Sequence, residues 1–210
     1  MFKKLLLITF LIPSFSAVAS PEKDFDEFVS YFENRFPDTP FEDYKNGVYS
    51  IDKSAREQWE AMEEFPPYEL NVDRGEELFN RPFKNGNTYG SCFENDGIGI
   101  RQNYPYFDTE KNKVVTLEGA LNDCRVKNGE KPLSYFKGKE LAHVSAYMAY
   151  TSRGNKFDIQ IPNTKEALDA YEDGKRLYFT KKGQLNFSCA DCHVYQTGTK
   201  LRADIPSPAI

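Results

Sequence analysis

The sequence predicts a mainly α-helical protein made of two small domains in tandem. Three observations support this fold class. Apolar residues recur at spacings of three and four along several segments, as they do on one face of an α-helix. The dipeptide Ser91-Cys92 returns 97 residues later as Ser188-Cys189, after similar preceding segments. The pentapeptide Cys189–His193 has the pattern Cys-x-x-Cys-His. A chain of 210 residues accommodates two domains of about 100 residues each.

The pattern at Cys189–His193 is the attachment signature of a c-type haem. Two thiols three positions apart at the start of a helix can reach the two vinyl groups on one porphyrin edge, and the adjacent imidazole can then bind the iron. We therefore predict one covalent haem c, with Cys189 and Cys192 as anchors and His193 as the metal ligand, and two cytochrome c-like domains. The alternatives are a redox dithiol, which does not require the histidine, and a zinc site, which needs more Cys or His ligands than the neighbouring sequence offers.

Residues 1–19 have the pattern of a secretory signal peptide. A basic start, Met1–Lys4, precedes the apolar stretch Leu5–Phe15 and the small-x-small sequence Ala17–Ala19. The apolar stretch is too short to cross a bilayer core of about 30 Å, and no later segment qualifies, so we predict no membrane span. We expect the protein to be exported to the bacterial periplasm, because haem is attached to exported proteins there and disulfides persist there.

The charge balance excludes nucleic acid as a partner. The chain has 27 basic and 32 acidic residues, and removal of Lys3 and Lys4 with the signal peptide leaves a net charge of about −7.

Two helices are predicted before the first domain proper. An amphipathic helix starts near Pro21, and a second runs over 53–64, with Asp52 as its cap and a stop before Pro66-Pro67. The first helix carries an apolar face made by Phe25, Phe28, Val29, Phe32 and Phe36. We assign residues 20–155 to one domain with this N-terminal extension.

The internal repeat suggests that this first domain has no haem. Arg74–Phe79 precedes Ser91-Cys92 in the same way that Asp173–Tyr178 precedes Ser188-Cys189. The first copy has Asn95 and Asp96, however, where the second has the second cysteine and the histidine.

Further helices are predicted over 117–125 and 137–152, the latter ending at Arg153-Gly154. A small cytochrome c domain ends in such a helix, packed across its first one. Within it, we interpret His143 as a surface or core-edge residue and Met148 as a core residue, rather than as haem ligands.

Cys92 and Cys124 are the two thiols that haem attachment does not use. In an oxidising compartment an even cysteine count favours a disulfide between them, with free thiols as the alternative. This bond would close a loop of about 32 residues and contribute on the order of 3 kcal/mol.

The second domain, residues 156–210, is predicted to be C-terminally incomplete. An extended linker over 157–162 leads to a helix with Asn163 and Glu166 as a capping box. A unit as long as the first would continue about 41 residues beyond Ile210. After His193 there is no Met, His or Cys that could be the distal haem ligand.

The flanks of the motif resemble the SoxA family, the cytochrome subunits of the Sox sulfur-oxidation system. The resemblance lies in Gly183–His193 and in Gly198-x-x-Leu201-Arg202-Ala203-Asp204. It extends to Arg74–Leu78, Asn122–Arg125 and Ser152–Gly154, and so covers most of the mature chain. Two-haem members carry a second Cys-x-x-Cys-His in the first half. Its absence here places the chain among single-haem members and supports a disulfide between Cys92 and Cys124.

The resemblance implies an enzyme, an L-cysteine S-thiosulfotransferase. With the cytochrome SoxX, such a protein oxidatively couples thiosulfate to a cysteine of the carrier SoxYZ, and the electrons pass to haem. In the family the distal haem ligand is a reactive cysteine, which we expect beyond Ile210, so residues 1–210 are expected to lack the catalytic cysteine. The alternatives are a simple monohaem electron-transfer cytochrome c and a binding module with a structural haem.

Overall fold

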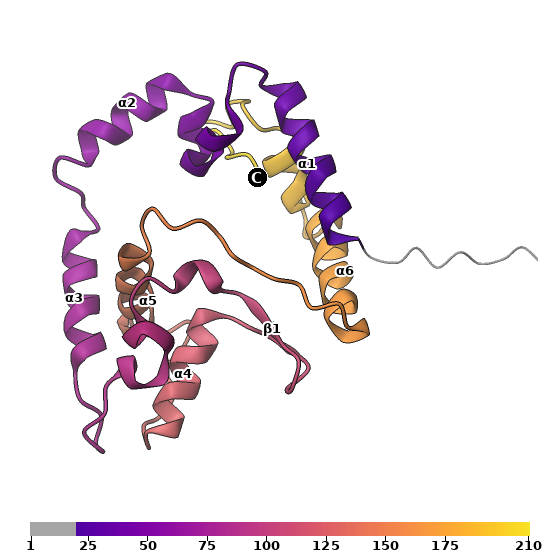
Figure 1. Ribbon diagram of the computed structural model, residues 1–210. Coiled ribbons are helices and arrows are strands. Elements are labelled where there is room, and N and C mark those ends of the chain that lie inside the picture. Colours follow the sequence, from indigo (N-terminus) through magenta and orange to yellow (C-terminus); the bar gives the residue numbers. More distant parts are fainter. Residues whose placement is uncertain (1–19) are drawn as a thin grey trace, which may run out of the picture.

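The computed structural model describes residues 20–210, and the predicted signal peptide lies outside this range. The described chain is mainly helical (Figure 1). None of the helices between residues 20 and 210 is both long enough and apolar enough to cross a membrane.

The elements follow one another along the chain with short connections. In order they are α1 (Pro21–Arg35), the 3-10 helix η1 (Phe41–Ser50), α2 (Lys53–Met62), α3 (Glu69–Asn80), the 3-10 turns η2 (Tyr89–Cys92), η3 (Glu94–Gly97) and η4 (Arg101–Asn103), the strands β1 (Tyr106–Asp108) and β2 (Lys113–Val115), α4 (Leu117–Lys127), α5 (Glu140–Thr151), α6 (Lys165–Phe179) and the π-helix η5 (Asp191–Tyr195). The two strands form an antiparallel hairpin, which the sequence analysis did not predict.

The predicted helices of the first half are confirmed. Helix α1 begins at Pro21, and α2 begins after Asp52, whose carboxylate accepts a hydrogen bond from the Ala55 N–H at 2.8 Å. Helix α5 starts three residues later than predicted, at Glu140, because Gly138 has a φ of +79° and leaves the right-handed helical region.

The predicted cap of α6 is wrong by one residue. Thr164, and not Asn163, is the N-cap, and its side-chain oxygen accepts a hydrogen bond from the Ala167 N–H at 3.3 Å. Both residue types can cap a helix, so local sequence alone did not separate them.

The core of the first half lies around the crossing of α3 and α5. Gly75 makes this crossing close, because a Cβ atom at this position would lie only 2.1 Å from the carbonyl oxygen of His143. Met148 is fully buried and is confirmed as a core residue. His143 is half-buried at the edge of the core. The core cluster consists of Leu78, Phe79, Phe83, Tyr89, Ile100, Leu117, Leu121, Cys124, Leu141, Val144 and Met148.

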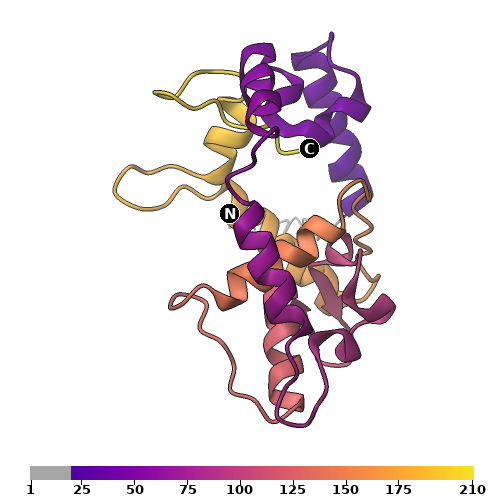
Figure 2. The ribbon, with the colours of Figure 1, turned by 90° about the vertical axis from the view of Figure 1, so that its left-hand side faces the viewer.

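The N-terminal helix α1 packs against the second half of the chain. The Phe28 and Phe179 rings meet edge to face with centroids 6.4 Å apart, and Lys175 forms an ion pair with Asp24 at 2.7 Å. Figure 1 shows α1 alongside α6, with α2 leading away from them to α3, and Figure 2 shows the molecule from the side on which α3 lies. Helix α1 therefore contacts α6, the helix that precedes the attachment motif.

Candidate haem-attachment site

A tight loop leads the chain into the attachment motif. Lys182 and Phe187 pair as an isolated antiparallel bridge at the two ends of this loop. Between them, Gly183 and Asn186 have φ values of +72° and +50°. Glycine and asparagine tolerate this left-handed conformation better than other residues do, so the local sequence allows the reversal that delivers Ser188 to the start of a helical turn.

Ser188 and Asp191 form a reciprocal cap at the start of this turn. The Asp191 carboxylate accepts a hydrogen bond from the Ser188 N–H at 2.7 Å, and the Ser188 hydroxyl oxygen accepts one from the Asp191 N–H at 3.1 Å. The bond from the Ser188 N–H lowers the pKa of Asp191, and Lys181 lowers it further from 3.4 Å. The carboxylate is thus held in its charged form at a helix N-terminus, where a negative charge is favourable.

The cap places the two motif cysteines one helical turn apart. Cys189 is the first residue of the turn and is exposed, Cys192 is half-buried, and neither forms a disulfide. The turn then widens, because the Gln196 N–H bonds to the Asp191 carbonyl, five residues back, at 3.0 Å. Such π-turns are frequently found at functional sites.

The ring of His193 is oriented by a residue near the C-terminal end of the chain. Its Nδ1 atom lies 3.0 Å from the carbonyl oxygen of Ser207. A carbonyl oxygen can only accept a hydrogen bond, so Nδ1 is the donor and Nε2 carries the free lone pair. A metal-binding histidine commonly has its second nitrogen fixed in this way.

The surroundings of the motif fit a haem group. The hydroxyl of Tyr178 is buried and has no hydrogen-bond partner within residues 20–210, and burial together with the nearby Cys189 and Cys192 thiols raises the pKa of Tyr178. Phe187 and Tyr195 flank the motif and are 59% and 53% exposed. Exposed aromatic side chains around two free thiols are what a large apolar cofactor would cover.

The donor set does not suit zinc. No group of three or more His, Cys, Asp or Glu side chains in residues 20–210 is placed to hold a metal ion. A zinc site built on the two motif thiols would need such a group. A haem, in contrast, needs one imidazole and two thiols, which the motif supplies.

The corresponding place in the first half is arranged differently. Cys92 forms a disulfide with Cys124, with the two Cα atoms 5.8 Å apart. Asn95 and Asp96, which align with the second cysteine and the histidine of the motif, have φ values of +48° and +51°. The backbone at these two residues is therefore in the left-handed region. Asp96 consequently does not lie in a right-handed helical turn, as His193 does in η5.

Aromatic side chains fill the core next to this disulfide. The Tyr89 ring lies between the Phe79 ring, at 6.0 Å, and the Phe83 ring, at 4.9 Å between centroids. The amide nitrogen of Asn128 lies 3.3 Å from the Cys92 sulfur and donates to the Cys124 carbonyl at 2.9 Å. These side chains pack closely around the disulfide and support the core of the first half.

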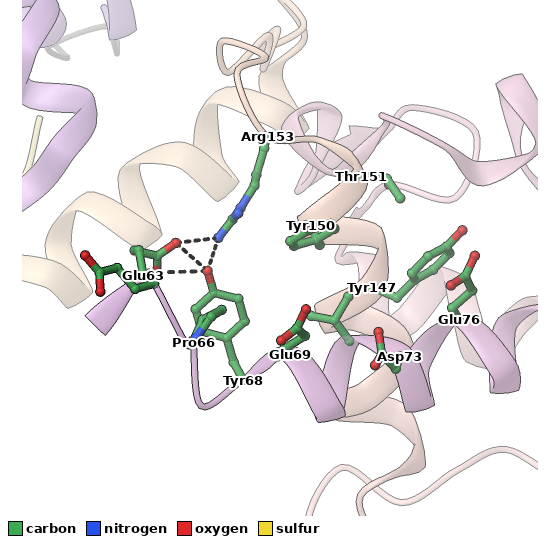
Figure 3. Close-up of a pocket in the computed structure, with 12 residues that line it drawn as sticks. Glu63, Pro66, Tyr68, Glu69, Asp73, Glu76, Tyr147, Tyr150, Thr151 and Arg153 are labelled. Carbon is green, nitrogen blue, oxygen red and sulfur yellow. Dashed lines mark hydrogen bonds and ion pairs between the residues drawn. The ribbon is translucent and has the colours of Figure 1, made fainter. Parts of the chain in front are cut away.

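A separate cavity of about 580 Å³ lies between the start of α3 and the end of α5 (Figure 3). At one end the Tyr68 hydroxyl donates to the Glu63 carboxylate at 2.7 Å, and Arg153 reaches both of these groups. The Arg153 guanidinium also lies 4.5 Å from the centre of the Tyr150 ring. The lining contains five carboxylates and no cysteine or histidine, so this cavity is not the predicted attachment site.

The supporting roles of three residues around the motif were not predicted from the sequence. Ser188 and Asp191 have the spacing of a capping box, and this local pattern could have been recognised. Ser207 gave no signal, because its role depends on contacts with residues far away in the sequence.

The helical fold and a family model define a cytochrome c-like protein. Residues 74–157 match the model described as the SoxA/TsdA cytochrome c domain. A chain in the crystal structure of SoxXA from P. pantotrophus has a similar fold, with a TM-score of 0.60 and 28% identity, and the match covers 69% of this chain and 55% of that one.

Curated relatives narrow this class to one family. The L-cysteine S-thiosulfotransferase subunit SoxA of Chlorobaculum tepidum is 52% identical over 90% of this chain and 65% of its own length. The subunit of the same name from Chlorobaculum thiosulfatiphilum is 50% identical over 94% of this chain and 69% of its own length, and that of Allochromatium vinosum is 50% identical over 91% and 68%. The chain belongs to the SoxA family. It spans about two thirds of the length of these relatives.

Proposed function

We propose that the chain carries one haem c, attached through Cys189 and Cys192 and bound at the iron by His193. The observation that carries this proposal is the capped turn, which presents both thiols and an imidazole whose Nδ1 is already held at 3.0 Å. We propose further that residues 20–155 form a haem-free cytochrome c-like domain, that residues 156–210 belong to the haem-binding domain, and that residues 1–19 direct export to the periplasm.

The proposed activity is the oxidative coupling of thiosulfate to a cysteine of a carrier protein. The relatives' name, L-cysteine S-thiosulfotransferase subunit SoxA, supports the transfer of thiosulfate to a cysteine. A carrier thiol and a thiosulfate dianion form a new sulfur–sulfur bond, and one proton and two electrons leave. The product is a carrier cysteine with an S-thiosulfonate group. The haem supplies a one-electron acceptor.

The two electrons call for a second acceptor, because one haem takes up one electron at a time. We propose that the cytochrome SoxX provides it, and that SoxYZ is the carrier. The similarity to a chain of a SoxXA crystal structure supports the first partner. The net negative charge of the chain can attract a basic partner surface, which would favour encounter.

The role of this chain's own residues is to hold the acceptor in place. The Ser188–Asp191 cap fixes the start of the attachment turn. The Ser207 carbonyl fixes the imidazole of His193. Each support uses a hydrogen bond to a backbone group. Such fixed partners keep the position of the ligand constant when the charge at the site changes.

The test is a reaction of the full-length mature gene product with SoxX, SoxYZ and thiosulfate. We expect the carrier to gain the mass of one thiosulfate and the haems to become reduced, with two electrons taken up for each carrier modified. A carrier with its cysteine replaced by serine is the control and should remain unmodified. Haem reduction without any carrier modification would contradict the proposal and favour a simple electron-transfer cytochrome.

A further inference from the structure

The N-terminal extension, which contains α1, η1 and α2, reaches the attachment site through Ser207. The Ser207 hydroxyl accepts a hydrogen bond from the Val48 N–H at 3.0 Å, while the carbonyl of the same serine accepts one from His193. One residue thus connects η1, some 160 positions earlier in the sequence, to the proximal imidazole.

The backbone at Gly47 makes this connection possible. Gly47 interrupts η1 with a φ of +57° and a ψ of −128°, a conformation that side chains with a Cβ rarely adopt. A Cβ atom at this position would lie 3.1 Å from the Ser207 hydroxyl oxygen. Glycine therefore lets the turn approach Ser207 closely and direct the Val48 N–H at its hydroxyl.

Helix α1 holds the other end of the attachment turn. The Arg35 guanidinium donates to the carbonyls of Tyr195 and Thr197 at 3.1 and 2.9 Å, and the Tyr31 hydroxyl donates to the Val194 carbonyl at 3.3 Å. Carbonyl groups at a helix C-terminus lack partners within the helix, so these side chains complete it. The extension consequently supports the turn at His193 and just beyond it.

We propose that Ser207 is a positioning residue for His193, and that the Gly47–Val48 turn of the N-terminal extension sets its place. The inference rests on the proposed attachment of haem to this motif. A hydrogen bond from Nδ1 makes an imidazole a stronger electron donor, which favours the ferric state of a bound haem. We call the two hydrogen bonds of Ser207, to Val48 and to His193, the clamp. The clamp is expected to lower the reduction potential of a bound haem and to fix the orientation of its proximal ligand.

The test compares three variants of the haem-loaded mature protein. Ser207→Ala removes the hydroxyl acceptor but keeps the backbone carbonyl. Ser207→Thr keeps a hydroxyl and should restore the wild-type behaviour. Ser91→Ala is the matched control, because the Ser91 hydroxyl is exposed and donates to the carbonyl of the nearby Thr88 at 2.7 Å. The readouts are the reduction potential, the iron–histidine band in the resonance Raman spectrum, and hydrogen exchange at the Val48 amide.

In Ser207→Ala we expect a higher reduction potential, a weaker iron–histidine band and Val48 exchange faster by about tenfold, since one hydrogen bond is lost. Ser207→Thr and Ser91→Ala should match the wild type in all three. A wild-type potential and band in Ser207→Ala would overturn the proposal, as would unchanged Val48 exchange. Absence of haem from the wild-type protein would instead refute the proposed function, while the exchange experiment would still report on the clamp.

Discussion

The close crossing of α3 and α5 predicts a large effect of one methyl group. In Gly75→Ala the new Cβ would lie 2.1 Å from the His143 carbonyl oxygen and 2.8 Å from the Tyr147 Cβ, and most of these neighbours are backbone atoms that cannot rotate away. Overpacking of a core costs about 1–3 kcal/mol or more, and the replacement of a helical glycine by alanine recovers about 1 kcal/mol. Because a separation of 2.1 Å requires the helices to move apart, we expect a net loss of about 2 kcal/mol in the free energy of unfolding.

The internal repeat supplies a matched control for this substitution. Gly174 occupies the equivalent position of α6, and a Cβ there meets no atom within 4 Å. Gly174→Ala in the same 210-residue chain should therefore increase the free energy of unfolding by about 0.5–1 kcal/mol. Urea denaturation followed by circular dichroism measures both values. Equal effects of the two substitutions would refute the argument that Gly75 is required by the helix crossing.

Two further predictions concern bonds that join distant parts of the chain. Cys92 and Cys124 should resist alkylation in the unreduced, unfolded protein, and replacing both by serine should lower the free energy of unfolding by about 3 kcal/mol; rapid labelling of both thiols without reductant would contradict this. Burial alone raises the pKa of Asp24, but the hydrogen bonds from Lys175 and Tyr171 lower it below 3.8. Its contribution to stability is therefore complete above the usual carboxyl pKa and is lost as the pH falls through the lower folded value. Asp24→Asn should remove this contribution to the pH dependence of unfolding, measured from about pH 2 to about pH 5, where carboxyl groups titrate. A pH profile identical to that of the wild type would show that the Asp24–Lys175 pair does not contribute to it.

Periodicity and capping signals predicted most of the helices. Pro21 and Asp52 marked the starts of α1 and α2 correctly, because a proline in the first turn and an acidic cap act through local backbone chemistry. The hairpin of β1 and β2 was missed, since strands of three residues carry too little alternation to be recognised.

The supports of the candidate site were harder to predict than its central residues. Cys189, Cys192 and His193 were recognisable because the spacing of their side chains is dictated by the cofactor they would hold. Ser207 and Gly47 act on this site only through the folded arrangement, in which the N-terminal extension packs beside α6. Sequence patterns do not report such pairings, because the two residues belong to no common local motif.

The number of haems per chain tests the account most directly. The mature protein should be produced in a host that attaches haem to exported apo-proteins, and the haem-to-protein ratio should be determined by the pyridine haemochrome assay. We predict one covalent haem per chain in the wild type. A variant with both Cys189→Ala and Cys192→Ala should carry no covalent haem and should retain the Cys92–Cys124 disulfide. A ratio of two in the wild type, or covalent haem remaining in the double variant, would contradict the assignment of the motif as the attachment site and of the first half as haem-free.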